Sequence, residues 1–216
     1  YHSPWWADYK SQNDYFARLS LLMSKGAQQN DILIIEPNAT LWSYYSHTKS
    51  SPKLMEVGQA FQDFITTLEK GQVEYDLGSE NIIKDHGAVT DGKFVVGKVA
   101  YTTVVLPPMM ETLNKPTFDL LQNFVQQGGR VITFSSPRLV DGAENAAWKT
   151  LLGGQSVTSV PRLTNEVIQN TFTDADCKFS FSGGNLFHQR RQFTDGELLF
   201  LVNSSMDEAV DGTVTV

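Results

Sequence analysis

Two short runs of aliphatic residues, each ending at a proline, organise the hydrophobic pattern of this chain. The first is Asp31-Ile-Leu-Ile-Ile-Glu-Pro37 and the second is Thr102-Thr-Val-Val-Leu-Pro107. Both are too short for a helix, and their unbroken apolar character predicts strands that are covered on both faces. Strands of that kind are typical of parallel sheets in α/β proteins, so we expect the two runs to be neighbours in one sheet.

Apolar residues spaced three and four positions apart predict the helices that accompany these strands. The helices run from about Ala7 to Lys25, from Ser51 to Gly71, and from Asn114 to Gly129. A further strand, Arg130–Phe134, follows the last helix directly, and a strand, a helix and a strand in this order form a right-handed βαβ unit.

Shorter segments fill the rest of the chain. We expect a loop at Asn38–Ser50, a strand at Val73–Asp76 and a brief helix capped by Ser79. We also expect a small extended or hairpin segment at Gly92–Gly97 and short helices at Glu144–Leu152 and Leu163–Phe172. From Lys178 onward the apolar residues alternate with polar ones, and Gly183-Gly184 and Asp195-Gly196 have the composition of turns.

The order of these elements predicts an α/β fold with a doubly wound, mostly parallel sheet, followed by a C-terminal antiparallel β segment. We expect a domain at 1–175 and the antiparallel segment at 176–216. That segment either completes the edge of the sheet or begins a β-sandwich. The strand-like end at Gly212–Val216 leads us to expect a piece of a longer protein.

Composition excludes several classes of protein. Of the 216 residues 41% are hydrophobic and 19% are charged, which is typical of a folded globular chain. A net charge of −7 and the lack of a basic cluster disfavour nucleic acid as a partner. No apolar stretch is long enough to span a bilayer, so we expect no membrane partner. The one cysteine, Cys177, excludes an internal disulfide and a cysteine-built zinc site.

The sequence contains none of the familiar motifs for phosphate, dinucleotide or zinc binding, and no serine-hydrolase motif. We therefore expect no metal site and no cofactor. The strand-to-helix position at Leu106-Pro-Pro-Met109 holds no cysteine nucleophile, and we interpret Cys177 as a small buried core residue.

Acidic and aromatic residues remain as candidates for a site. Glu36 and Glu80 follow predicted strands, and a glycosidase needs two acids about 5 to 9 Å apart, although acids in such positions also cap helices. The aromatic residues after the first strand suit either a sugar ring or a neighbouring domain. The candidates for the rim of a sugar site are Glu36, Trp42, Tyr44, Tyr45, Glu80, His86 and Arg190.

The order of several segments resembles a known family. The segments are Pro4-Trp-Trp6, Tyr15-Phe-Ala-Arg-Leu-Ser20, Gly128-Gly-Arg-Val-Ile132 and His188-Gln-Arg-Arg191, together with the two proline-ended runs. They resemble the region after the catalytic barrel in large bacterial glycoside hydrolases of the family-106 α-L-rhamnosidase group. The resemblance implies a three-layer, amidotransferase-like or flavodoxin-type domain, similar to the β-galactosidase trimerisation domain, followed by the start of a β-sandwich.

In proteins of that group the acid and base lie on the barrel, so the resemblance assigns no catalytic residue to this chain. We expect a non-catalytic accessory domain of a multidomain glycoside hydrolase acting on polysaccharide, in the periplasm or outside the cell. Its partners would be the other domains of the same polypeptide, the catalytic barrel and the β-sandwich, and carbohydrate. The alternatives are an independent carbohydrate-binding or assembly module, and a self-contained glycosidase that uses Glu36 and Glu80.

Overall fold

The computed structural model describes residues 3–172 and 177–216. Backbone contacts divide the chain into two compact units. The smaller unit comprises residues 1–29 and 188–202, and the larger unit comprises residues 30–187 and 203–216. The predicted domain boundary between residues 175 and 176 lies outside the described residues and stays a prediction.

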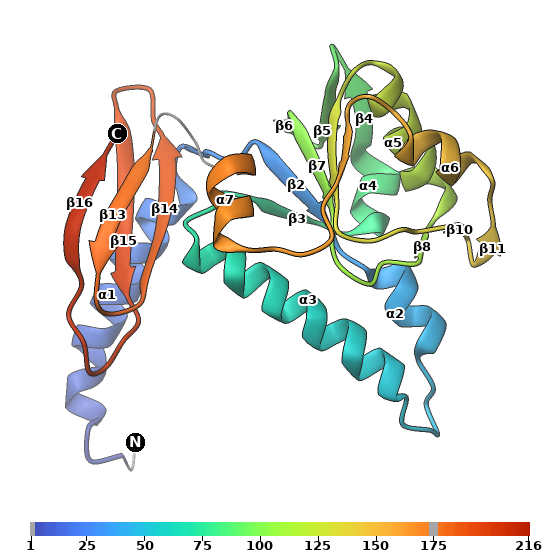
Figure 1. The fold of residues 1–216 in the computed structure, drawn as a ribbon. Helices are drawn as coiled ribbons and strands as arrows, with labels where there is room; N and C mark the ends of the chain where they lie inside the picture. The colour runs from blue at the N-terminus through green and yellow to red at the C-terminus, as the bar shows by residue number, and fades with distance from the viewer. Residues whose placement is uncertain (1–2, 173–176) are drawn as a thin grey trace. The chain divides into compact units, whose positions relative to one another are not determined.

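A five-stranded parallel sheet forms the centre of the larger unit (Figure 1). Its strands, in spatial order, are β12 (Val157–Ser159), β9 (Arg130–Thr133), β7 (Thr103–Leu106), β2 (Ile32–Ile35) and β3 (Asp76–Gly78). The two proline-ended runs are β2 and β7, which pair in parallel, so the prediction that they are neighbours is confirmed. When the five strands are numbered by their position along the chain, their spatial order is that of flavodoxin-like folds.

The strands alternate their side chains between two buried clusters, one on each face of the sheet. Leu33 and Ile35 point into one cluster, and Ile34 points into the other. Helices α4 (Glu80–His86), α5 (Lys115–Gln126) and α6 (Ala147–Leu152) contribute to the first cluster. Helices α3 (Pro52–Lys70) and α7 (Asn165–Thr171) contribute to the second. The α/β fold predicted from the sequence is confirmed, and the sheet is covered on both faces.

Two predictions for the segments that follow β2 and precede β3 are wrong. Residues 38–50 are not a continuous loop, because α2 (Asn38–Tyr44) occupies the first half. This helix has no apolar stripe for the sequence to reveal, and contacts with other segments hold it. The strand predicted at Val73–Asp76 lies at Asp76–Gly78, since Val73 still bonds back to the end of α3 through Leu68.

Small sheets extend the larger unit. The segment predicted to be extended or a hairpin forms β5 (Lys93–Val96), the middle strand of a three-stranded sheet with β4 (Gly87–Thr90) and β6 (Val99–Tyr101). A second small sheet contains β8 (Thr112–Leu113), β10 (Leu139–Val140) and β11 (Ala143–Glu144). The helix predicted from Glu144 begins only at Ala147, because Asp141 and Gly142 have positive φ and turn the chain into β11.

The late strands are antiparallel, as predicted, and form sheets of their own. In the larger unit β13 (Lys178–Ser182) pairs with β16 (Asp211–Thr215). A further sheet has the order β1 (Ala27–Gln28), β14 (Leu186–Gln192) and β15 (Glu197–Asn203). Within the described residues none of these strands joins the parallel sheet.

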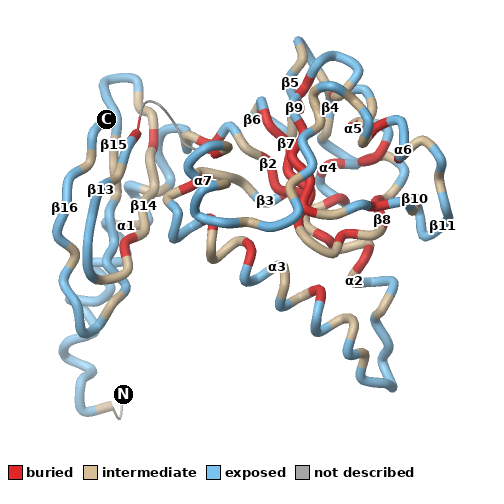
Figure 2. Tube along the Cα trace, in the orientation of Figure 1, coloured by how far each residue is buried: buried red, intermediate tan, exposed pale blue. Residues whose placement is uncertain are grey.

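The smaller unit contains a short 3-10 helix η1 (Trp6–Asp8), the helix α1 (Tyr9–Ser24), β1 and most of β14 and β15. The predicted N-terminal helix is confirmed, but none of its described residues is buried. Figure 2 shows α1 as exposed along most of its length, whereas buried residues concentrate in the strands of the parallel sheet. Within the described residues no helix is long and apolar enough to cross a membrane.

Candidate functional site

The strand order places a topological switch point between β2 and β7. The chain leaves β2 toward β3 on one side, whereas it leaves β7 toward β9 and β12 on the other. In open α/β sheets ligands bind outside the carboxyl ends of the strands at such a point. The residues that follow β2 and β7 therefore define the candidate site.

The carboxyl end of β2 presents Glu36, which is half-buried. Its carboxylate accepts a hydrogen bond from Asn38 Nδ2 at 3.0 Å, and its backbone N–H donates to the carbonyl of Gly78 at 3.0 Å. The second bond continues the pairing of β2 with β3 by one residue. Glu36 is thus fixed at the sheet edge, with its side chain directed toward the start of α2.

Thr40 joins α2 to the segment after β7. Its hydroxyl oxygen accepts hydrogen bonds from the backbone N–H groups of Glu111 at 3.0 Å and Thr112 at 3.2 Å. The side chain is fully buried, and the next turn of α2 adds a bond from the Tyr44 hydroxyl to Glu111 Oε2 at 2.6 Å. That bond, and then burial, raise the pKa of Tyr44 above 10.0. The two contacts fix α2 across the carboxyl end of β7.

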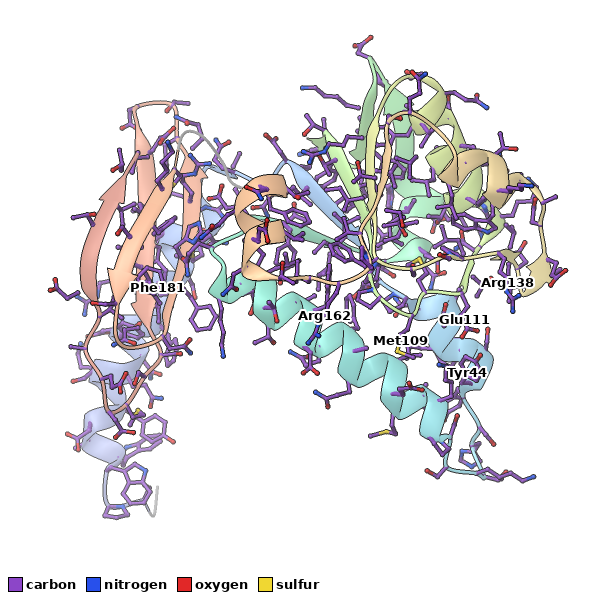
Figure 3. The ribbon with its side chains drawn as sticks, in the orientation of Figure 1. Tyr44, Met109, Glu111, Arg138, Arg162 and Phe181 are labelled. Carbon is purple, nitrogen blue, oxygen red and sulfur yellow. The ribbon has the colours of Figure 1, made fainter. Side chains whose placement is uncertain are left out.

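The segment after β7 has an unusual backbone. Met109 adopts a positive φ of 62°, which is uncommon for a side chain of its size. Two residues later the carbonyl of Glu111 accepts from the backbone N–H groups of Arg138 at 3.2 Å and Leu139 at 3.1 Å. Tyr44, Met109, Glu111 and Arg138 consequently lie along one edge of the larger unit (Figure 3).

Two further side chains belong to the carboxyl ends of β9 and β12. Ser135 follows β9, and its buried hydroxyl has no hydrogen-bond partner within the described part of the chain. Arg162 follows β12 and is exposed. Arg138 is also exposed, so this edge combines carboxylates, hydroxyls and two cationic side chains.

Two exposed aromatic rings lie at the C-terminal end of α2, one within the helix and one on the residue that follows it. Trp42 is 70% exposed and Tyr45 is 55% exposed. Their ring centroids are 5.4 Å apart with an interplanar angle of 72°, an edge-to-face contact. Such rings offer an apolar surface with polar tips, which is suited to carbohydrate or to another protein surface.

Glu80 lies in the interior, at the start of α4, and is only 3% exposed. Its carboxylate accepts hydrogen bonds from the backbone N–H groups of Ala39 at 3.2 Å and Asn114 at 2.6 Å. Burial raises the pKa of the Glu80 carboxyl above 4.5, the amides of Asn114 and Ala39 lower it, and the nearby charge of Asp141 raises it further. Glu80 thereby joins the first turns of α2 and α4 to the segment that begins α5.

The structure brings four of the seven predicted rim residues together, namely Glu36, Trp42, Tyr44 and Tyr45. Glu80 lies beneath them and bonds to the same helix. His86 is the last residue of α4, one helix length from Glu80, and Arg190 belongs to β14 in the smaller unit. The role of each in ligand binding stays a prediction.

Sequence reasoning missed Thr40, Met109, Glu111, Ser135 and Arg138. The Pro-Pro pair before Met109 indicates a turn, but a positive φ has no sequence signal when the residue is methionine. Among the described residues no group of three or more His, Cys, Asp or Glu side chains could hold a metal ion. Cys177 is 7% exposed, so the prediction that it is buried is confirmed.

Comparison with known proteins shows a likeness to a solved structure. The sequence matches no protein-family model and no curated protein. Among solved structures the chain is similar to the structure of a rhamnosidase from Novosphingobium sp. PP1Y, with a TM-score of 0.60 and 18% sequence identity. The likeness covers 92% of this chain, and the chain spans 19% of the rhamnosidase.

At this identity the likeness shows the fold alone. It shows that a fold similar to that of this chain occurs in a protein described as a rhamnosidase.

Proposed function

We propose that this chain is a non-catalytic accessory domain of a multidomain, α-L-rhamnosidase-like glycoside hydrolase that acts on polysaccharide. In this proposal the domain supports the catalytic barrel, and the edge formed by Glu36 and α2 contributes to the rim of the sugar site. The observation that carries the proposal is the likeness of 92% of this chain to 19% of a rhamnosidase.

The environment of the two candidate acids also favours an accessory role. A glycosidase needs one carboxyl that donates a proton and a second that acts as base or nucleophile, both facing the sugar. Glu80 is buried, and two backbone amides bind its carboxylate. Glu36 bonds to Asn38 within its own turn. Glu80 is therefore better suited to holding α2 and α5 in place than to reaching a substrate.

An assay on an aryl α-L-rhamnoside tests the proposal. We expect the 216-residue chain to show no turnover and the full polypeptide encoded by its reading frame to hydrolyse the substrate. Turnover by the chain alone, lost in both Glu36→Gln and Glu80→Gln variants that retain the wild-type circular dichroism spectrum, would establish the self-contained glycosidase instead.

The exposed Trp42 and Tyr45 pair supports a second candidate, an independent carbohydrate-binding module. Calorimetric titration with rhamnose-containing oligosaccharides separates the two roles, because a scaffold gives no binding heat. A binding module would give heat that Trp42→Ala and Tyr45→Ala abolish. Met55→Ala is the matched control, since Met55 is 70% exposed on the neighbouring α3.

A further inference from the structure

The apolar residues of α1 form a stripe that is largely exposed. We define the α1 stripe as Tyr9, Tyr15, Phe16, Leu19, Leu22 and Met23. Their spacing places them on one face of the helix. Only Leu19 and Met23 are half-buried, whereas Tyr15 is 55%, Phe16 is 51% and Leu22 is 42% exposed.

The aromatic rings of this region contact one another in pairs. The rings of Tyr15 and Phe16 have centroids 5.3 Å apart, and those of Trp6 and Tyr9 have centroids 5.5 Å apart. Trp5, next to Trp6, is 62% exposed. Contiguous exposed apolar surface of this kind marks interaction sites, and aromatic side chains are enriched in protein interfaces.

The smaller unit has no apolar core of its own that would explain the stripe. Among its described residues only Arg191 is buried, and every apolar side chain is half-buried or exposed. The exposed apolar surface includes Leu201 and Val202 of β15. A unit of this size cannot stabilise an amphipathic helix without another apolar surface, because helix stability in proteins comes mainly from burial of the apolar face.

The charges of α1 and the structural likeness together indicate what covers the stripe. Lys10 forms an ion pair with Asp14 at 2.6 Å, and Arg18 donates to the carbonyl of Asp14 at 3.0 Å. The polar face is thus of mixed charge, unlike the lysine- and arginine-rich face of helices that lie on membranes. The rhamnosidase that this chain resembles is about five times longer than the matched portion, which favours a covering surface within one polypeptide.

We propose that the α1 stripe docks on an apolar surface of another domain of the same polypeptide. The inference rests on the proposed function, since it requires a larger enzyme of which this chain is one domain. The inference goes beyond the proposed function by naming the surface that makes the contact. This surface is one face of α1, centred on Phe16, Leu19 and Leu22.

Amide hydrogen exchange of α1 tests the docking. We expect α1 amides to exchange at least tenfold more slowly in the full polypeptide of the reading frame than in the 216-residue chain. The double variant Phe16→Ser with Leu22→Ser should abolish this difference. Both contexts are measured for every variant, so that fraying of the helix itself cancels in the ratio of exchange rates.

Leu21→Ser is the matched control. Leu21 is 55% exposed and is adjacent to Leu22, but its position two residues from Leu19 and Met23 places it away from the stripe. We expect it to keep the slow exchange of the full polypeptide. Equal effects of Leu21→Ser and of the double variant would overturn the docking face.

Other outcomes identify other occupants and overturn the proposal. Protection that rises with the concentration of the 216-residue chain would indicate a second copy, and protection by phosphatidylglycerol vesicles would indicate a membrane surface. A full polypeptide that hydrolyses the rhamnoside while α1 exchanges as fast as in the 216-residue chain would refute the docking and leave the proposed function standing. A reading frame without a further domain would refute both.

Discussion

The two units of this molecule differ in how far they bury their apolar side chains. In the larger unit β2, β7 and β9 are sandwiched between two clusters of buried side chains, one on each face. In the smaller unit the only buried described residue is Arg191, whose guanidinium donates to the carbonyls of Lys25 at 2.6 Å and Gly26 at 3.1 Å. Apolar burial therefore stabilises one unit, and hydrogen bonds between strands hold the other.

The helices α1 and α5 show the same difference in the burial of an apolar face. Both have apolar residues at helical spacing, and this spacing predicts both helices. In α5 Phe118, Leu121 and Phe124 are at most 2% exposed, whereas the corresponding face of α1 is open. Periodicity in a sequence therefore predicts that a helix has an apolar face, but not that the same chain covers it.

The largest expected change in stability is the difference between replacing a phenylalanine of α5 and replacing one of α1. Phe124 is fully buried and contacts the ring of Phe94 edge to face, with centroids 5.7 Å apart. Phe124→Ala should lower the free energy of unfolding by about 3–5 kcal/mol, because it removes a buried ring and leaves a cavity. Phe16→Ala should change it by less than about 0.5 kcal/mol.

Urea denaturation of the 216-residue chain, followed by circular dichroism, measures both variants. A loss of about 2 kcal/mol or more in Phe16→Ala would show that the chain itself covers the α1 stripe, and would remove the contrast between the two units.

Next in size is the effect of Glu80, which holds three segments of the larger unit together. Glu80→Ala leaves the N–H groups of Ala39 and Asn114 without their acceptor, and we expect a loss of about 3 kcal/mol. Glu80→Gln keeps one acceptor oxygen and should lose less. An unchanged free energy of unfolding in Glu80→Ala would show that water satisfies these amides equally well.

Glu80 also gives stability a pH dependence whose sign follows from its raised pKa. A carboxyl with a higher pKa in the folded state stabilises the fold fully below its unfolded pKa of 4.5 and loses that contribution as pH rises through the folded pKa. The free energy of unfolding of the wild type should therefore fall relative to that of Glu80→Gln as pH rises above 4.5. The difference between the two should become constant above the raised pKa. A difference that is flat across this range would contradict the assignment.

The sequence predicts those parts of the fold that depend on local pattern. β2, β7, β9, α3 and α5 lie where the aliphatic runs and helical spacing indicate. The sequence does not reveal α2, because this helix is held by Thr40 and by Glu80, and not by an apolar stripe. Contacts between residues some 40 to 70 positions apart are invisible to a local pattern.

The candidate site shows the same limit. Glu36 and the aromatic residues of α2 are predictable because they follow a recognisable strand. Glu111 joins them through the Tyr44 hydroxyl and the Thr40 side chain, and Arg138 joins them through its backbone bond to the carbonyl of Glu111. Their residue types carry no motif, so only the folded chain identifies them.

A smaller loss of stability is expected when the hydrogen bonds of Arg191 in the smaller unit are removed. Arg191→Ala removes both bonds to the carbonyls of Lys25 and Gly26, and we expect a local loss of about 2 kcal/mol. Faster amide exchange at Ala27 and Gln28, which pair with β14, should report it. Gln189→Ala is the control, because its bond to Gln28 Oε1 is exposed and should contribute little. Equal exchange in both variants would mean that the strand pairing does not depend on Arg191.

The smallest expected effect compares how α5 and α1 begin. The side chain of Asn114 accepts a hydrogen bond from the N–H of Thr117 at 2.9 Å, whereas Asp8 at the start of α1 makes no such capping bond. Asn114→Ala should therefore cost about 1 kcal/mol, and Asp8→Ala should cost less than about 0.5 kcal/mol. Urea denaturation of the two variants measures the difference. A cost of about 1 kcal/mol for Asp8→Ala would show that the start of α1 unfolds together with the larger unit. The two units would then differ in how much apolar surface they bury and not in how firmly they are held.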